Sequence, residues 1–176
     1  MQVFEQYDPR NPQPKHQLLR FFKSPQEENN GTDFFFLTQD KHLLVYREQR
    51  HTYPPTSDYK PGQTELFANQ FEMPLEAIRW LIDVIEQKFF KSPENGGLSA
   101  HKISYEEIVA GEDLHVMRSA NAGCPHTGYV ITNGSRHSHF DSDDLQTLAL
   151  SDPWLFQNGL MDFLKELANK YEQGTL

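Results

Sequence analysis

The sequence predicts an α+β fold with two tandem pseudo-repeats, each an antiparallel sheet of three or four strands followed by one C-terminal helix. Two observations lead to this prediction. Residues 74–91 and 153–170 align at a spacing of 79 positions, and each of these helix-like segments follows tracts that are typical of β-strands. The alignment pairs Pro74 with Pro153, Leu81 with Leu160, Asp83 with Asp162 and Lys91 with Lys170. A duplication of this kind constrains the core of the protein.

The first repeat is expected over residues 33–91, after a proline-rich N-terminal arm over residues 1–32. The prolines of the arm disfavour regular structure and leave one short helix at residues 16–23. After an apolar run at 34–38, residues 42–50 alternate in polarity, and residues 65–73 suit a further strand. Pro74 then opens a helix, because proline is favoured at the first helical position. Its buried stripe is predicted to be Leu75, Ile78, Ile82, Ile85 and Phe89.

The second repeat is expected over residues 102–172, after a linker at residues 92–101. Its predicted strands are residues 102–108, 114–119, 128–135 and 145–150. Asp152 is positioned to cap the last helix, with Pro153 at its first turn. The stripe predicted to be buried is Phe156, Leu160, Phe163, Leu164, Leu167 and Tyr171. Neither half is long enough to cover a sheet by itself, so we expect both repeats to share one compact domain.

Composition indicates an acidic protein, and an acidic balance favours solubility and cationic partners. The formal net charge is −9, whereas proteins that grip a phosphate backbone usually carry an excess of Lys and Arg. The single cysteine excludes an intramolecular disulfide and suits a reducing compartment. No apolar run reaches the ~20 residues needed to span a bilayer, and the N-terminus carries no secretory signal. We therefore expect a cytoplasmic protein that does not insert into membranes.

The order of strands and proline-opened helices resembles that of the Whirly and PUR-type proteins, over roughly residues 33–91 and 103–172. This resemblance implies curved sheets that bind single-stranded nucleic acid, with basic residues along the backbone and aromatic rings stacked on bases. The residues of this chain that suit such a role are Lys41, Tyr46, Arg47 and Arg50. A solvated sheet edge would explain the same charges.

The resemblance has a second implication, because some bacterial immunity proteins that neutralise toxic nucleases also have a Whirly-like fold. These proteins are often acidic, since the toxin surface that they cover is basic, and complementary charge speeds and selects association. The acidic run in this chain is Asp141, Asp143 and Asp144. A basic protein is therefore an alternative partner to single-stranded nucleic acid.

Residues 124–144 hold the densest group of side chains that can bind a metal. A hairpin joining Cys124 and His126 to His137 and His139 would offer thiolate and imidazole ligands, which zinc prefers. Zinc is thus a possible cofactor, and a polar loop facing water is the alternative. The sequence contains no P-loop, nucleophile elbow or H-E-x-x-H motif. We rank a non-enzymatic binding role above an enzyme.

Overall fold

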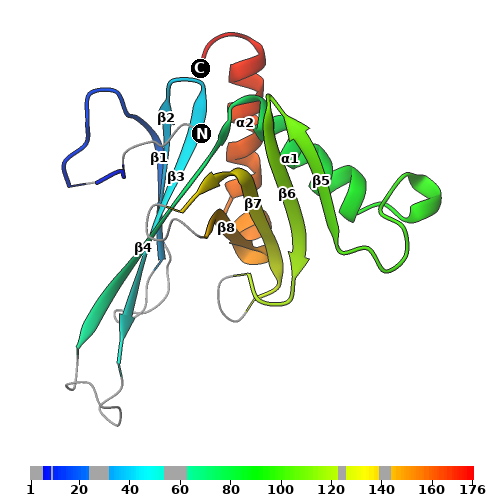
Figure 1. The fold of residues 1–176 in the computed structure, drawn as a ribbon, viewed down its shortest axis with the longest axis horizontal. Helices are drawn as coiled ribbons and strands as arrows, with labels where there is room; N and C mark the ends of the chain where they lie inside the picture. Colours follow the sequence, from blue (N-terminus) through cyan, green and yellow to red (C-terminus); the bar gives the residue numbers. More distant parts are fainter. Residues whose placement is uncertain (1–5, 9, 24–31, 54–62, 123–125, 139–143) are drawn as a thin grey trace. The chain divides into compact units, whose positions relative to one another are not determined.

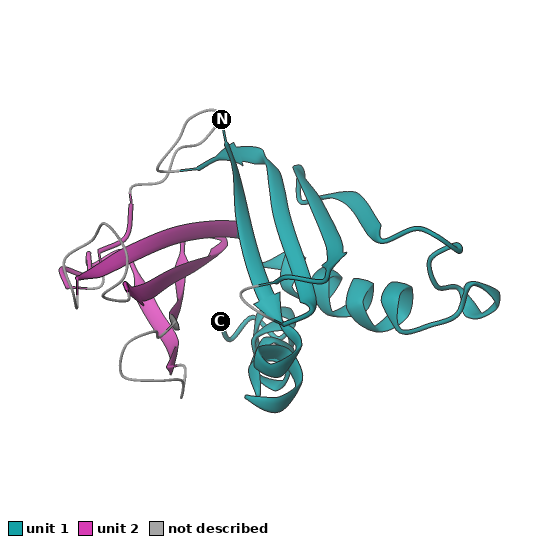
Figure 2. Ribbon diagram, turned by 90° about the horizontal axis from the view of Figure 1, so that it is seen from below, with its two compact units in different colours: residues 1–3, 73–176 teal, residues 4–72 magenta. Residues whose placement is uncertain are grey.

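The structure, a computed structural model, describes residues 6–8, 10–23, 32–53, 63–122, 126–138 and 144–176. It contains two antiparallel four-stranded sheets, each followed by helical segments, so the predicted α+β class and the duplicated order are confirmed (Figure 1). The chain divides into two compact units, residues 4–72 and residues 73–176 together with 1–3 (Figure 2). Within the described ranges, no helix is long and apolar enough to cross a bilayer.

The unit of residues 4–72 holds the first sheet. Its strands, in spatial order, are β1 (Gln17–Lys23), β2 (Thr32–Gln39), β3 (His42–Thr52) and β4 (Thr64–Pro74). The unit boundary falls inside β4. The apolar run and the alternating segment seen in the sequence form the paired strands β2 and β3, in which Phe36 lies opposite Val45.

Residues 17–23 form a strand, so the short helix predicted at residues 16–23 is wrong. The sheet therefore begins within the segment that we assigned to the N-terminal arm. Two ring contacts join β1 to β2, between Phe21 and Phe35 at 4.8 Å and between Phe22 and Phe36 at 5.6 Å. Such cross-strand aromatic pairs stabilise a sheet and here override the local helical pattern.

The arm packs on the first sheet through Tyr7. This side chain is buried in a cluster with Leu37, Leu44 and Tyr46. Its backbone N–H donates to the amide oxygen of Gln70 at 2.7 Å, which satisfies a buried donor. Tyr7 therefore anchors the arm to the first sheet.

The unit of residues 73–176 holds the second sheet and the helices of both repeats. The helical segments are α1 (Glu76–Asp83), η1 (Val84–Phe89), η2 (Pro93–Asn95), η3 (Pro153–Gln157) and α2 (Leu160–Glu172). The strands, in spatial order, are β5 (Ser104–Val109), β6 (Glu112–Ser119), β7 (Gly128–His137) and β8 (Leu145–Ser151). Figure 1 shows α1 and α2 along one face of this sheet. Phe89 of η1 contacts Tyr129 of β7 edge-on, with ring centroids 5.2 Å apart, so Tyr129 marks the face that the helices cover.

The helices of the two repeats bury equivalent positions. Leu81 and Leu160 are both buried, and so are the next aligned pairs, whereas Asp83 and Asp162 are both exposed. The aligned buried pairs are Ile82 with Met161, Val84 with Phe163 and Ile85 with Leu164. Because α1 and α2 contact each other, the two copies of the stripe contribute to one shared core.

The second helix is not continuous, which corrects two sequence predictions. Gly159 has φ +76°, and this left-handed residue separates η3 from α2. Upstream of this break, Phe156 is 44% exposed instead of buried. Asp152 does not cap η3 through its side chain. Its carboxylate instead accepts two hydrogen bonds from the Arg118 guanidinium, at 2.5 and 2.6 Å, and a third from the Thr127 hydroxyl at 2.7 Å.

These contacts predict a pH dependence of stability. The hydrogen bonds from Arg118 lower the pKa of Asp152 below its ordinary value of 3.8, and burial only partly opposes this shift. A carboxyl group whose folded pKa is depressed stabilises the fold above its unfolded pKa and loses that contribution as pH falls through the folded pKa. At pH ~7, Asp152→Asn should therefore be less stable than the wild type by on the order of 1–2 kcal/mol. Urea unfolding should show this gap closing below pH 3.8.

Candidate functional site

The residues predicted to bind nucleic acid lie on β3 and its preceding turn, but they do not form an exposed aromatic face. The Tyr46 side chain is 3% exposed and packs against the Tyr7 ring, with centroids 5.5 Å apart. Burial, together with the neighbouring Glu48 carboxylate, raises the pKa of Tyr46 to about 12. In this arrangement the Tyr46 ring presents no face on which a base could stack.

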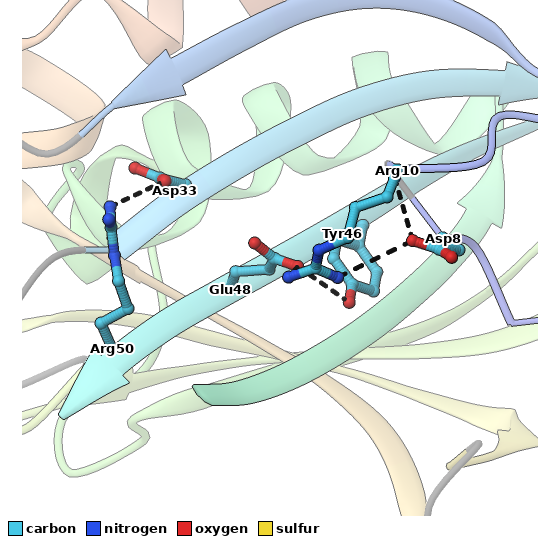
Figure 3. Close-up of polar contacts among 6 residues, drawn as sticks. All are labelled: Asp8, Arg10, Asp33, Tyr46, Glu48 and Arg50. Carbon is cyan, nitrogen blue, oxygen red and sulfur yellow. Dashed lines mark hydrogen bonds and ion pairs between the residues drawn. The ribbon is translucent and has the colours of Figure 1, made fainter. Parts of the chain in front are cut away.

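Of the basic residues predicted to bind nucleic acid, one is ion-paired, one is partly buried and one is exposed. Arg50 forms an ion pair with Asp33 at 3.1 Å, and Arg10 spans the neighbouring Glu48 and Asp8 (Figure 3). Arg47 points to the opposite face of β3 and is partly buried, which lowers its pKa through desolvation. Lys41 is exposed in the turn before β3.

The same use of arginine recurs through the described residues. Carboxylates pair with Arg79, Arg118 and Arg136 in the unit of residues 73–176, as they do with Arg10 and Arg50 in the other unit. The remaining two arginines are Arg47, which is partly buried, and Arg20, whose guanidinium lies 5.8 Å from the Phe22 ring centroid. Most of the arginine side chains are therefore used in contacts within the protein.

The metal-binding arrangement expected from residues 124–144 is not assembled as predicted. His126 precedes β7 and His137 ends it, so this strand separates them by well over ~20 Å at ~3.3 Å per residue. The expected hairpin between them is therefore wrong. Cys124 and His139 lie outside the described residues. Within the described ranges, no three His, Cys, Asp or Glu side chains converge as metal ligands.

Of the predicted acidic run, the described residues include only Asp144, since Asp141 and Asp143 lie outside them. Asp144 is exposed just before β8. Its backbone carbonyl accepts a hydrogen bond from the Ser138 N–H at 2.6 Å. Because Asp144 is exposed, its carboxylate is available to solvent next to the second sheet.

A groove of about 650 Å³ lies between α1 and the edge strand β5. Tyr105 and Glu107 line its sheet side; they pair with Val116 and Leu114 of β6 and so face the helices. The helix side is lined by Glu76, Arg79, Trp80, Asp83, Val84, Gln87 and Lys88. Strand alternation and helix periodicity thus bring aromatic and acidic side chains together at one edge of the sheet.

One carboxylate organises the aromatic walls of this groove. The Trp80 indole N–H donates to Glu107 Oε2 at 2.9 Å, and the Tyr105 hydroxyl donates to the same oxygen at 3.2 Å. Within the described chain, no donor hydrogen-bonds the other carboxylate oxygen, Oε1. The Lys88 ammonium lies 5.5 Å from the centroid of the Tyr105 ring. The groove therefore already accommodates a cation against an aromatic face.

An ion pair between Arg79 and Glu172 holds the opposite wall of the groove. Arg79 Nε donates to Glu172 of α2 at 2.8 Å, and the guanidinium also donates to Asn169 at 2.5 Å. The hydrogen bond to Glu172 raises the pKa of Arg79 and so favours the charged guanidinium. Glu76 and Asp83 are exposed on the same rim. The formal charge of the groove, after this pairing, is negative.

Strand β5 leaves one edge of the sheet open. Among the described strands it pairs only with β6. A second hollow, of about 480 Å³, is lined by residues 97–99 and by Lys102, Ser104, Tyr105 and Glu106 at this edge, and it shares Lys88 and Tyr105 with the groove. Two apolar side chains at this edge are exposed to solvent: Ile103, just before the strand, is 59% exposed, and Ile108, near its end, is 73% exposed.

Sequence reasoning did not single out this groove. Trp80 and Glu107 are 27 positions apart in the sequence, and none of the lining residues belongs to a recognised motif. The signal available in the sequence was the alternation of Tyr105 and Glu107 in the strand predicted at residues 102–108, together with a tryptophan outside the predicted buried stripe of the first helix. No protein-family model matches the chain, and no curated protein matches it in sequence.

Proposed function

We propose that this chain is a non-enzymatic cytoplasmic binding protein that covers a basic surface of a protein partner, as immunity proteins do for toxic nucleases. One observation carries the proposal. The chain has a net charge of −9, and most of its arginines are already neutralised by carboxylates of the same chain. The remaining excess of carboxylates makes the outer field negative. We also propose that the duplicated sheets and helices are of the Whirly type.

Charge favours a protein over nucleic acid as the partner. Nucleic-acid binding draws its affinity from cations that displace counterions from phosphates, and in this chain 16 Lys and Arg are outnumbered by 25 Asp and Glu. A basic protein surface gains from the same field, which raises the encounter rate and disfavours anionic competitors. The Tyr46 ring is buried and is therefore not available for the base stacking that single-strand binding uses.

Equilibrium binding to two defined probes tests the proposal. Fluorescence anisotropy at low ionic strength compares a labelled peptide of alternating arginine and threonine with labelled oligo-dT, each titrated with the full chain. We expect the peptide to bind, the affinity to fall as salt is added, and oligo-dT to leave the signal unchanged. A glutamate–threonine peptide serves as the matched control. Binding of oligo-dT, or no binding of the arginine peptide, overturns the proposal.

A further inference from the structure

We infer that the groove between α1 and β5 receives an arginine side chain from an extended segment of the basic partner, which adds as a fifth strand to the open edge of β5. This inference rests on the proposed function and specifies how it is carried out. The chemistry of the groove suits a guanidinium. A guanidinium stacks on aromatic faces and pairs with a carboxylate through two parallel hydrogen bonds, and Trp80, Tyr105 and Glu107 present both features together.

The state of the Glu107 carboxylate supports a cationic ligand. Both donors of the aromatic walls converge on Oε2, so Oε1 is left to accept a hydrogen bond from a ligand. The two donors also fix the orientation of the carboxylate before the ligand arrives, which reduces the entropy lost on binding. The Lys88 ammonium beside Tyr105 shows that the wall tolerates positive charge. The Lys88 ammonium would therefore compete with the incoming guanidinium for the face of the Tyr105 ring.

The unpaired edge of β5 supports the addition of a strand. An unpaired edge is a template for another strand, and its unpaired N–H and C=O groups give an added segment its main-chain affinity. On β5 the neighbouring carboxylates of Glu106 and Glu107 oppose pairing with a second copy of this chain, because like charges would face each other. The same carboxylates favour a basic segment. The hollow along residues 102–106 gives this segment room beside the edge.

The geometry of a strand connects the two parts of the inference. Alternate residues of an added strand point to the helix-covered face of the sheet, as Tyr105 and Glu107 do. One arginine of the segment would thus enter the groove, while its neighbours face solvent beside Glu106 and Ile108. The exposed side chains of Ile103 and Ile108 offer apolar contacts at the two ends of the strand.

The test uses anisotropy of the arginine–threonine peptide with the full chain and two matched variants. Glu107→Gln keeps an oxygen that can accept from Trp80 and Tyr105 but removes the charge, and we expect it to weaken binding about tenfold or more. Glu106→Gln removes the same charge from the opposite face of the same strand and should weaken binding less than about threefold. Lys88→Met removes the resident cation and should tighten binding. Circular dichroism checks that each variant keeps its fold.

A backbone-modified probe tests the strand pairing separately. N-methylation of alternate residues of the peptide removes its strand donors and leaves its charge, so the affinity for the wild type should fall by about tenfold or more. Equal losses in Glu106→Gln and Glu107→Gln, or full affinity of the methylated peptide, overturn the inference while the proposed function stands. If the wild-type chain binds no arginine peptide at all, both fail together.

Discussion

Replacing Arg136 with methionine is expected to lower the free energy of unfolding by about 3 kcal/mol. The Arg136 side chain is 5% exposed, and its guanidinium forms an ion pair with the Glu112 carboxylate, which is 13% exposed. A second hydrogen bond runs from Arg136 Nε to Glu112 Oε2 at 2.9 Å. The substitution leaves the Glu112 carboxylate largely buried without its arginine partner, although the Asn133 side chain still donates to it at 2.5 Å. Urea unfolding of the full chain measures the loss.

A double variant separates the lost ion pair from lost packing. Arg136→Met combined with Glu112→Leu removes both charges, and buried pairs replaced by apolar side chains of similar volume are often neutral. We therefore expect the double variant to be more stable than Arg136→Met alone. A double variant that is less stable would show that packing of the arginine stem dominates, and would contradict the role assigned to the ion pair.

Tyr129→Ala is expected to destabilise the unit of residues 73–176 by about 3–5 kcal/mol. Tyr129 is 1% exposed and is the largest of the fully buried side chains. Its ring meets Phe89 edge-on and lies 4.7 Å from the Arg118 guanidinium carbon, so it joins η1 to the sheet. Removing the ring opens a cavity under the helices and withdraws both contacts.

Tyr129→Phe is the matched control for this position. Burial raises the pKa of the Tyr129 hydroxyl, and Arg118 partly offsets that shift, so the phenol stays neutral at ordinary pH. Loss of the hydroxyl alone should change the free energy of unfolding by less than about 1.5 kcal/mol. If alanine and phenylalanine had the same small effect in thermal or urea unfolding, the ring would not be the connection between η1 and β7.

The duplicated pattern could be predicted from the sequence because its signal is periodic. The aligned pair Leu81 and Leu160 is buried as expected, since apolar residues at helical spacing must find a core. Failures occur where tertiary contacts override local pattern. Residues 17–23 carry no strong alternation and become β1 because β2 supplies aromatic partners. The break at Gly159 depends on a left-handed backbone that helical periodicity does not reveal.

The candidate site was harder to predict, because it depends on which charges find partners. Arg136 in the sequence is simply a basic residue on a strand. In the structure the irregular register between Asn133 and His137 accompanies a buried pair with Glu112. The groove likewise needs α1 and β5 side by side, and no spacing rule connects Trp80 to Glu107. Composition still predicted an acidic protein, whereas the carboxylate partners of its arginines are apparent only in the structure.

The most direct test of the proposed recognition of a basic partner is a two-ligand titration of the ¹⁵N-labelled full chain, followed by NMR. We expect the arginine–threonine peptide to shift the amide signals of residues 102–108 and the indole N–H signal of Trp80. We also expect oligo-dT to leave the spectrum unchanged at the same ionic strength. Shifts caused by oligo-dT in the signals of Lys41, Arg47 and Arg50, with no response of β5 to the peptide, would contradict the proposed recognition.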